Sequence, residues 1–296
     1  MKILLFGKNG QLGWELQRSL APLGDLVALG SKGEGLPSDF CEPQRLAETV
    51  RELRPDVIVN AAAYTAVDKA ESEPDAARQI NALATGVLAE EAKALGALLV
   101  HYSTDYVFDG AGDDWRFEDA PTGPLSVYGK TKLEGEQLIA AAGADALVLR
   151  TSWVYAARGG NFAKTMLRLA SERDQLKVVA DQIGAPTGAD LLADITAHLI
   201  RATLQDRARC GTYHAVASGE TSWHQYAQHV LTRARDKGVT LKVQPEQVEA
   251  LASSAYPTPA PRPLNSRLDN HKLQDRFGLV LPHWQTGVDR LLDEIL

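Results

Sequence analysis

The sequence predicts an α/β protein with a Rossmann-type doubly wound parallel sheet and a smaller, mixed α/β substrate-binding lobe. Near-continuous short apolar runs alternate with amphipathic stretches, which is typical of parallel strands covered by helices on both faces. The strand-like runs are residues 3–6, 26–29, 57–60, 98–102 and 147–150, and the helical stretches are 43–53, 74–95 and 127–142. From Gln11 onward the apolar residues Leu12, Leu16 and Leu20 also follow helical spacing.

A glycine ladder follows the first strand-like run directly. Gly7, Gly10 and Gly13 stand between that run and the first predicted helix. The first glycine permits a tight turn, the second lets backbone N–H groups approach a pyrophosphate, and the third lets helix and strand pack closely. A purely structural turn is the alternative, but the strand-turn-helix context favours a dinucleotide-binding turn.

Beyond residue 150 the alternation loosens. Strand-like residues 177–179 and 212–216 are mixed with helical stretches at 162–170, 191–204 and 223–235, and a proline-rich stretch occupies 254–268. We therefore expect a dinucleotide-binding Rossmann domain at 1–150 and mainly a substrate-binding lobe at 151–296, interleaved with the first. Ligands of such sheets bind at the carboxyl ends of the strands.

Composition excludes several classes of protein. The 296 residues are 45% hydrophobic, which is ample for a core, and the net charge of -7 argues against a nucleic-acid-binding surface. No apolar run approaches the roughly 20 residues that span a bilayer, so we expect a cytoplasmic protein without a membrane partner. Cys41 and Cys210 are far apart and no histidines cluster, so the sequence suggests neither a disulfide nor a zinc site.

The segment V-Y-G-K-T-K-L contains a candidate acid and its partner. On a helix Tyr128 and Lys132 would share one face, where an ammonium can lower the pKa of a phenol and suit it to general acid catalysis. A tyrosine packed beside a surface lysine is the alternative. Thr104, in S-T-D-Y-V-F-D-G, and the glycine ladder favour the catalytic interpretation.

The predicted strand ends carry further candidate residues. Asn60 leads into A-A-A-Y-T, whose small residues would let the backbone lie against a cofactor, although a tight helix–strand contact is the alternative. The next strand ends in H-Y-S-T-D, which places Thr104 beside the same crevice. The strand after it ends in R-T-S-W-V-Y and presents Trp153 as a core residue or a ligand contact.

Taken together, the motifs of this chain resemble a known family. G-x-x-G-x-x-G, N-A-A-A, S-T-D-Y-V-F-D-G, Y-G-K-T-K-L, R-T-S-W-V-Y, N-F-x-K-T-M-L-R-L and R-P-x-N-S-x-L are similar to the extended short-chain dehydrogenases/reductases, nearly end to end. More narrowly, they resemble the branch that reduces dTDP-4-dehydro-L-rhamnose to dTDP-L-rhamnose for cell-surface polysaccharides, with NAD(P)H as hydride donor. Dehydratases of this fold usually read T-D-E where Thr104, Asp105 and Tyr106 stand here, so this chain lacks their second acid.

The resemblance implies a role for each matched residue. Tyr128 would donate a proton to the C4 carbonyl oxygen, Lys132 would hold the ribose and lower the tyrosine pKa, and Thr104 would hydrogen-bond the same oxygen. The cofactor would also be held by Gly7, Gly10, Gln11, Leu12, Gly13, Asp39, Phe40, Ala62, Ala63, Tyr64 and Tyr102. The sugar of the substrate would contact Thr104, Asp105 and Trp153, and the diphosphate would bind Arg262 and Arg267.

The second strand departs from the usual dinucleotide pattern. Many such folds place an acid there to hold the adenosine ribose, whereas this chain has Gly30, followed by Ser31 and Lys32. Without a carboxylate to repel a 2′-phosphate, we expect NADPH to be used, with NADH also plausible. The alternative is that this loop is merely solvated and Asp39 discriminates between the two cofactors.

Two other functions stay open at this stage. One is a reductase or epimerase acting on another nucleotide sugar. The other is a non-catalytic dinucleotide-binding partner protein, like the regulatory subunit of methionine adenosyltransferase. A homodimer also stays open: some relatives are metal-bridged dimers, and Glu15 and Asp190 are acidic here, but the sequence by itself argues for neither Mg²⁺ nor another metal.

Overall fold

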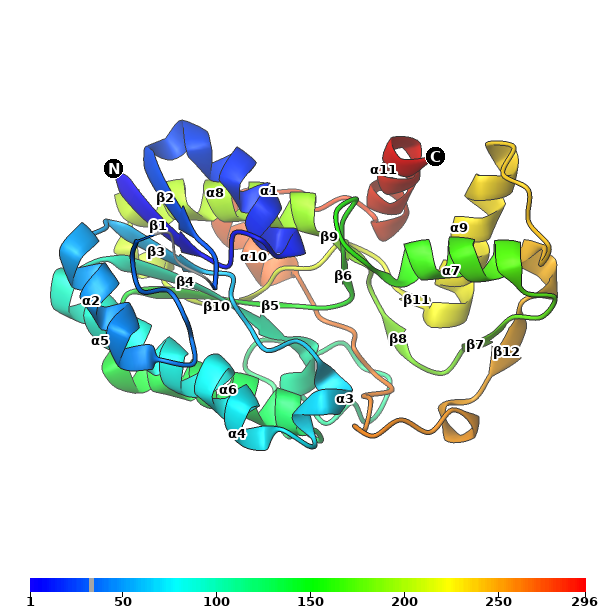
Figure 1. Ribbon diagram of the computed structural model, residues 1–296, viewed down its shortest axis with the longest axis horizontal. Helices are drawn as coiled ribbons and strands as arrows, with labels where there is room; N and C mark the ends of the chain where they lie inside the picture. The colour runs from blue at the N-terminus through cyan, green and yellow to red at the C-terminus, as the bar shows by residue number, and fades with distance from the viewer. Residues whose placement is uncertain (32–34) are drawn as a thin grey trace.

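A six-stranded parallel sheet forms the centre of the molecule (Figure 1). The computed structural model describes residues 1–31 and 35–296. The strand order is β10-β5-β4-β3-β1-β2, and every neighbouring pair is parallel. The strands are β1 (Lys2–Phe6), β2 (Asp25–Leu29), β3 (Val57–Asn60), β4 (Leu98–Thr104), β5 (Ala146–Thr151) and β10 (Gly211–His214). The predicted fold class is therefore confirmed.

Helices cover both faces of the sheet, as its apolar strands require. One face packs against α1 (Gln11–Leu20), α8 (Ala189–Gln205) and α10 (His271–Phe277), and the other against α2 (Pro43–Leu53), α5 (Ala84–Leu95) and α6 (Val127–Ala142). Every residue of β3 and β4 is buried. Each large aliphatic side chain buried in these two cores stabilises the fold by about 1.5 to 3 kcal/mol.

The predicted helix at 74–95 is interrupted. It consists of α4 (Pro74–Arg78), a π-helical turn η2 (Gln79–Leu83) and α5. The turn buries Asn81, whose Oδ1 accepts a hydrogen bond from Tyr64 N at 2.8 Å and whose Nδ2 donates to Thr131 Oγ1 at 3.1 Å. Hydrophobic periodicity does not reveal such a turn, because one extra residue per turn barely alters the apolar pattern.

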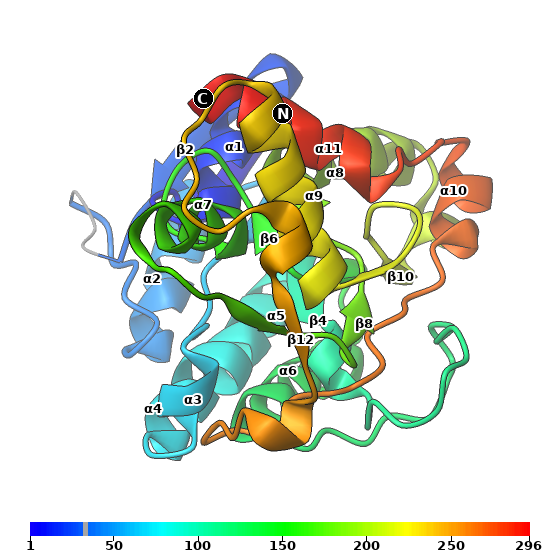
Figure 2. The ribbon, with the colours of Figure 1, turned by 90° about the vertical axis from the view of Figure 1, so that its right-hand side faces the viewer.

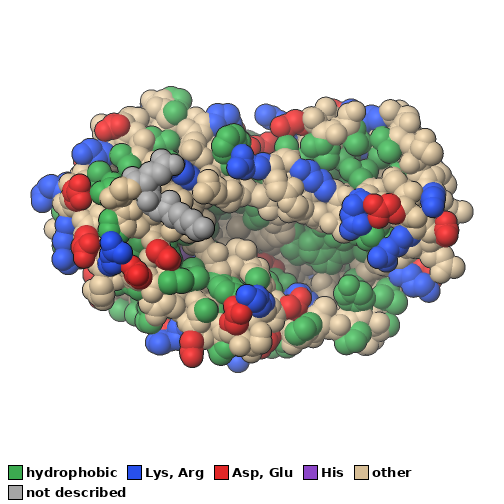
Figure 3. Space-filling model, in the orientation of Figure 1, with side chains coloured by type: hydrophobic (Ala, Val, Ile, Leu, Met, Phe, Trp, Pro, Cys, Tyr) green, Lys and Arg blue, Asp and Glu red, His purple; other side chains and the backbone are tan. Residues whose placement is uncertain are grey.

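A smaller lobe lies beside the carboxyl ends of the strands (Figures 1 and 2). Its main helices are α7 (Phe162–Glu172), α9 (Trp223–Asp236) and α11 (Trp284–Ile295), and they enclose separate cores. Its short strands pair as β6 (Val154–Tyr155) with β9 (Thr187–Gly188), β7 (Lys177–Val179) with β12 (Glu249–Leu251), and β8 (Ile183–Gly184) with β11 (Thr221–Ser222). Figure 3 shows a hollow between this lobe and the sheet.

The remaining short elements are turns and connections. They are α3 (Val67–Ala70) and the 3₁₀ turns η1 (Ala21–Leu23), η3 (Asp105–Val107), η4 (Arg207–Arg209), η5 (Pro245–Gln247) and η6 (Ser253–Ala255). Strand β10 and helix α8 come after residue 150 but belong to the sheet. The functional division of the chain near residue 150 therefore stays a prediction, in which these later elements return to the first domain.

The sheet changes direction between β1 and β3, where its ligand crevice is expected. From β1 the chain goes to β2 on one side and then returns to β3 on the other. Gly7 lies in this crevice with φ +88°, and a Cβ there would lie 2.7 Å from the carbonyl carbon of Ala61. Glycine is required at position 7 for both reasons.

The glycine ladder yields a prediction about stability. A Cβ at Gly13 would lie 2.0 Å from Gly7 O, whereas a Cβ at Gly10 would lie 3.5 Å from the same atom, an ordinary contact. Gly13→Ala should therefore lower the free energy of unfolding by about 1 to 3 kcal/mol. Gly10→Ala, the matched control, should change it by only about 0.5 kcal/mol. Urea unfolding measures both, and equal stabilities of the two variants would contradict this account of the turn.

Candidate active site

The start of α6 carries the candidate acid Tyr128 to the carboxyl end of β4. Ser126 caps the helix, its hydroxyl accepting from Gly129 N at 3.2 Å. A Cβ at Gly129 would lie 2.2 Å from Tyr106 O, so only glycine allows the helix to approach this closely. As a result the rings of Tyr128 and Tyr106 meet edge to face, with centroids 5.5 Å apart, next to Thr104.

Lys132 lies one helical turn further on, as the sequence predicts, and is almost fully buried. Its Nζ donates to Tyr102 O at 2.6 Å and lies 3.1 Å from His101 Nε2. Burial lowers the pKa of Lys132 to about 8, while the nearby carboxylate of Glu136 acts in the opposite direction.

The expected lowering of the Tyr128 pKa by Lys132 is not what the structure shows. Desolvation raises the pKa of Tyr128 to about 12, a hydrogen bond with Thr104 lowers it in part, and the charge of Asp105 raises it. Lys132 has no resolved effect, since its Nζ is directed to the backbone of Tyr102. The phenol is consequently protonated at neutral pH and holds a proton that it could donate.

Asp105, predicted to contact the sugar, is hydrogen-bonded within the protein. Its carboxylate is buried, with Oδ1 accepting from Thr104 Oγ1 at 3.0 Å and Oδ2 from Ser266 Oγ at 2.5 Å. Burial raises the pKa of Asp105 to about 6, although both hydroxyl hydrogen bonds act to lower it. Because both oxygens already have protein partners, Asp105 links Thr104 to the C-terminal segment.

The glycine turn is suited to a dinucleotide. Within the described residues no side chain caps the first turn of α1, so its backbone N–H groups remain available to an anion. Gly10 has room for a Cβ within the protein, so nothing in the fold itself requires glycine there. Gln11 Oε1 is buried without a partner at the same turn. The available N–H groups and the room at Gly10 fit a bound pyrophosphate, whereas the Gln11 oxygen is an acceptor and needs a donor instead.

The other predicted cofactor residues near this crevice differ in exposure and in hydrogen-bond partners. Ala62 N donates to Asn60 Oδ1 at 3.1 Å beside the glycine turn, and Ala63 follows it on the exposed side. The hydroxyl of Tyr64 donates to Glu73 at 2.6 Å. Leu12 is half-buried in the first turn of α1, near Gly13.

Two predicted aromatic contacts are directed into the protein. The hydroxyl of Tyr102 lies 2.6 Å from Thr196 Oγ1 on α8, so only its backbone faces Lys132. Phe40 is buried against Phe6, with ring centroids 5.5 Å apart. Both side chains act in the core rather than as open contact surfaces.

A small hollow lies at the end of β2, where the sequence predicts the adenosine side of the cofactor. Ser31 and Asp39 line a cavity of about 250 Å³, and Gly30 lies next to it, buried. Lys32, the predicted cation, lies outside the described residues. The structure adds Lys8, whose Cε lies 3.8 Å from the point that a Cβ of Gly30 would occupy.

Trp153 stands at the wall between sheet and lobe with an unusual backbone. Its φ is +49°, a conformation that a non-glycine residue adopts only when its surroundings impose it. The ring stacks on Trp223 with centroids 3.6 Å apart, and a Cβ at Gly184 would lie 2.9 Å from it. Sequence reasoning found Trp153 but missed these two neighbours, which lie far away in the chain.

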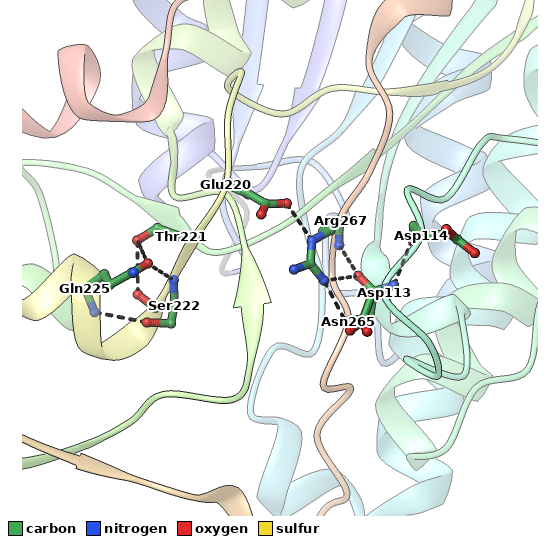
Figure 4. Close-up of polar contacts among 8 residues, drawn as sticks. All are labelled: Asp113, Asp114, Glu220, Thr221, Ser222, Gln225, Asn265 and Arg267. Carbon is green, nitrogen blue, oxygen red and sulfur yellow. Dashed lines mark hydrogen bonds and ion pairs between the residues drawn. The ribbon is translucent and has the colours of Figure 1, made fainter.

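The two predicted diphosphate cations already have anionic partners. Arg262 pairs with Asp68 at 2.8 Å, and Arg267 pairs with Glu220 at 2.5 Å and also contacts Asn265 (Figure 4). Glu220 lies two residues before Ser222, which forms with Gln225 the capping box that starts α9. A diphosphate would therefore have to compete with carboxylates for both guanidinium groups.

The acidic side chains of Glu15 and Asp190 form ion pairs within the described residues rather than a metal site. No group of three or more His, Cys, Asp or Glu that could hold a metal ion occurs within 1–31 and 35–296. Glu15 pairs with Arg18 at 3.4 Å and Asp190 with Arg290 at 3.6 Å. Over the same described ranges, no helix has the length and apolar character needed to cross a membrane.

The chain belongs to the family described as RmlD substrate binding domain, whose model matches residues 1–296. Its curated relatives include the dTDP-4-dehydrorhamnose reductases of Salmonella typhimurium (57% identical over 296 residues) and Escherichia coli K12 (56% over 295 residues). Each alignment covers 100% of this chain and 98% of the relative. The predicted resemblance is thus confirmed.

Solved structures agree with this assignment. A dTDP-4-dehydrorhamnose reductase from Clostridium acetobutylicum superposes with a TM-score of 0.88 at 35% identity, covering 100% of this chain and 99% of the other. The enzyme of the same name from Bacillus anthracis, in complex with NADP, gives a TM-score of 0.87 at 34% identity over 99% of both chains. A Thermus thermophilus UDP-glucose 4-epimerase, 18% identical with a TM-score of 0.77 over 100% of this chain and 99% of its own, shows the shared fold alone.

The burial of Asp105 predicts a pH-dependent cost in stability. Its pKa is raised to about 6 from an ordinary value of 3.8, so its favourable contribution is complete below pH 3.8 and is lost as the pH rises through 6. The stability of Asp105→Asn relative to the unaltered protein should therefore increase by about 3 kcal/mol between acidic and neutral pH. Urea unfolding across that range measures it.

The matched control is Asp113→Asn, which alters a fully exposed carboxylate. Its stability relative to the unaltered protein should stay level over the same range. If the stability of Asp105→Asn relative to the unaltered protein also stays constant with pH, burial does not raise the pKa of this carboxylate in the folded state.

Proposed function

We propose that this protein is an NADPH-dependent reductase that converts the C4 carbonyl of dTDP-4-dehydro-L-rhamnose to the alcohol of dTDP-L-rhamnose. The observation that carries the proposal is the grouping of Thr104, Tyr128 and Lys132 at the carboxyl end of β4. This grouping lies in the same sheet-end crevice as an uncapped helix N-terminus. The full-length similarity to enzymes with this activity supports the choice of substrate.

Three side chains share the work at the reacting carbonyl. The nicotinamide cofactor supplies the hydride when it is bound. Tyr128, protonated at neutral pH, gives its phenolic proton to the C4 oxygen. Thr104 stands beside Tyr128 and donates to that oxygen as charge develops on it, for which its hydroxyl proton turns away from Asp105 Oδ1, its acceptor in the structure. Lys132, buried one helical turn away, holds the ribose next to the phenol.

The substrate lies in the hollow between sheet and lobe in this proposal. Trp153, held by its stack on Trp223, forms one wall for the sugar. Arg262 and Arg267 reach the diphosphate by exchanging carboxylate partners for phosphate oxygens. Residues 1–150 supply most of the cofactor side, and 151–296 supply most of the substrate side.

For the cofactor, we infer that NADPH is preferred to NADH. The Bacillus anthracis relative is in complex with NADP. Gly30 presents no carboxylate to a 2′-phosphate, and the Lys8 side chain passes close to it. An exposed ion pair contributes only about 0.2 to 1 kcal/mol, so the preference should be roughly two- to fivefold.

The direct test follows the oxidation of reduced cofactor with a panel of 4-keto nucleotide sugars. The proposal expects turnover to be fastest with dTDP-4-dehydro-L-rhamnose. Faster turnover of a different nucleotide sugar would favour the related reductase or epimerase. Cofactor binding without turnover of any sugar would favour a non-catalytic partner protein, which the intact Thr104, Tyr128 and Lys132 argue against.

Replacing the proposed acid gives a sharper prediction. Tyr128→Phe removes the proton donor but keeps the ring, so kcat should fall by about two to four orders of magnitude. The dissociation constant for NADPH should change little. The control Tyr213→Phe removes a phenol on β10 that donates to Arg209 O of η4, and it should retain turnover. Near-normal kcat in Tyr128→Phe would remove Tyr128 from the mechanism.

The glycine after β2 gives a prediction about cofactor choice. Gly30→Asp should raise the dissociation constant for NADPH above that for NADH, because a carboxylate repels the 2′-phosphate and accepts bonds from ribose hydroxyls. The new Cβ would displace only the side-chain amide of Asn9, 2.6 Å away. Gly30→Asn adds the same bulk without charge and should not reverse the preference. Unaltered selectivity in Gly30→Asp would assign discrimination to another group.

A further inference from the structure

Three buried side chains form a row behind the proposed site. Asn60 on β3 faces its strand partner His101 on β4, with Nδ2 3.1 Å from His101 Nδ1. The other ring nitrogen, Nε2, lies 3.1 Å from Lys132 Nζ on α6. Asn60 and His101 are each 1% exposed and Lys132 is 2% exposed, so these contacts are shielded from bulk solvent.

The orientation of the Asn60 amide is determined by its neighbours. Its Oδ1 accepts from Ala62 N at 3.1 Å, so the other atom is the amino group. That Nδ2 donates to Thr85 Oγ1 at 3.3 Å, and the Thr85 hydroxyl proton goes to Asn81 O at 3.0 Å. The second N–H of Asn60 therefore points at His101 Nδ1, which must accept and carries no proton.

The tautomer of His101 follows from this contact. Burial is the main cause that lowers the pKa of His101 well below its usual value, so the ring is neutral. A neutral ring with an unprotonated Nδ1 carries its proton on Nε2, directed at Lys132 Nζ. An ammonium would meet that N–H donor with another donor. An uncharged amine has a lone pair to accept it and still donates to Tyr102 O.

The other charged groups around Lys132 do not favour the ammonium strongly. Glu136 on the same helix raises the Lys132 pKa, but both its oxygens are held by Arg150 of β5, at 3.0 and 2.7 Å. Tyr128 carries no negative charge at neutral pH. Across the described part of the chain, no carboxylate forms an ion pair with Nζ.

We propose that His101 is a positioning residue for the reaction, which through its Nε2–H favours the uncharged amine of Lys132 over the ammonium in the cofactor-free protein. The role rests on the proposed reductase function, since it acts through Lys132. Charging Lys132 then requires the ring of His101 to change tautomer and the amide of Asn60 to turn. The charge of the lysine is thus coupled to the backbone of Ala62, which lines the proposed cofactor crevice.

The decisive measurement needs neither a variant nor activity. A long-range proton–nitrogen spectrum of protein labelled with nitrogen-15 in its histidines should show His101 protonated on Nε2 at about pH 10, where Lys132, with a pKa of about 8, is uncharged. His214 is the internal control, because its Nδ1 lies 3.0 Å from Asp269 O and must carry the proton there. His101→Gln and His214→Gln assign the two signals. His101 protonated on Nδ1, or on both nitrogens, would overturn the proposal while leaving the reductase function untouched.

A second measurement follows Lys132 itself by the carbon-13 shift of its ε-carbon, assigned with Lys132→Arg. In His101→Gln the amide oxygen can accept from an ammonium, so the titration midpoint of Lys132 should rise by about one pH unit or more. The pH at which kcat changes should move in the same direction. His271→Gln, at an exposed ring, should leave the midpoint unchanged. An unchanged midpoint in His101→Gln would contradict the proposed coupling.

Discussion

The close approach of α6 to the end of β4 is the constraint on which the proposed site depends. A Cβ at Gly129 would lie 2.2 Å from Tyr106 O, and one at Gly135 would lie 2.5 Å from Asn81 O. Any side chain at either position would push the helix outward, since backbone atoms cannot yield as the end of a flexible side chain does. The two glycines therefore place Tyr128 beside Thr104 and bury Lys132 under the sheet.

Burial gives these polar groups their chemistry. In water Lys132 would be an ordinary ammonium and Asp105 an ordinary carboxylate, but under the sheet both charged forms are disfavoured. Each group keeps hydrogen-bond partners, because an unpaired buried polar atom costs about 1 to 3 kcal/mol. The buried side chains of Arg150 and Glu136 also satisfy each other, through two parallel hydrogen bonds between β5 and α6.

The C-terminal segment joins the two parts of the molecule. Ser266 bonds Asp105 at the end of the sheet, and the neighbouring Arg267 bonds Glu220 in front of α9. The wall around Trp153 combines residues from β8 and α9 in the same way. The sheet supplies the reacting groups, whereas the side facing a substrate is assembled from segments that return late in the chain. A shift of the lobe would therefore act on Thr104 through Ser266 and Asp105.

Much of the fold and the skeleton of the site could be predicted from local patterns in the sequence. Alternating apolar runs predicted β1 to β5, the helix at 127–142 matched α6, and the spacing of Tyr128 and Lys132 predicted one shared face. Such features depend on residues close together in the chain, where periodicity and glycine spacing have direct physical meaning. The family resemblance then supplied the activity.

Tertiary structure alone decided the partners of these groups. Lys132 bonds Tyr102 O and faces His101 rather than the phenol, and Asp105 bonds Ser266, 161 positions away. Packing also gave Arg262 and Arg267 carboxylate partners, which no residue pattern indicated. The sequence determined which chemical groups are present and on which elements they lie. Packing determined which atoms are in contact and how deeply each group is buried. It thereby also determined which groups carry charge, because pKa values and hydrogen bonds depend on distance and burial rather than on sequence spacing.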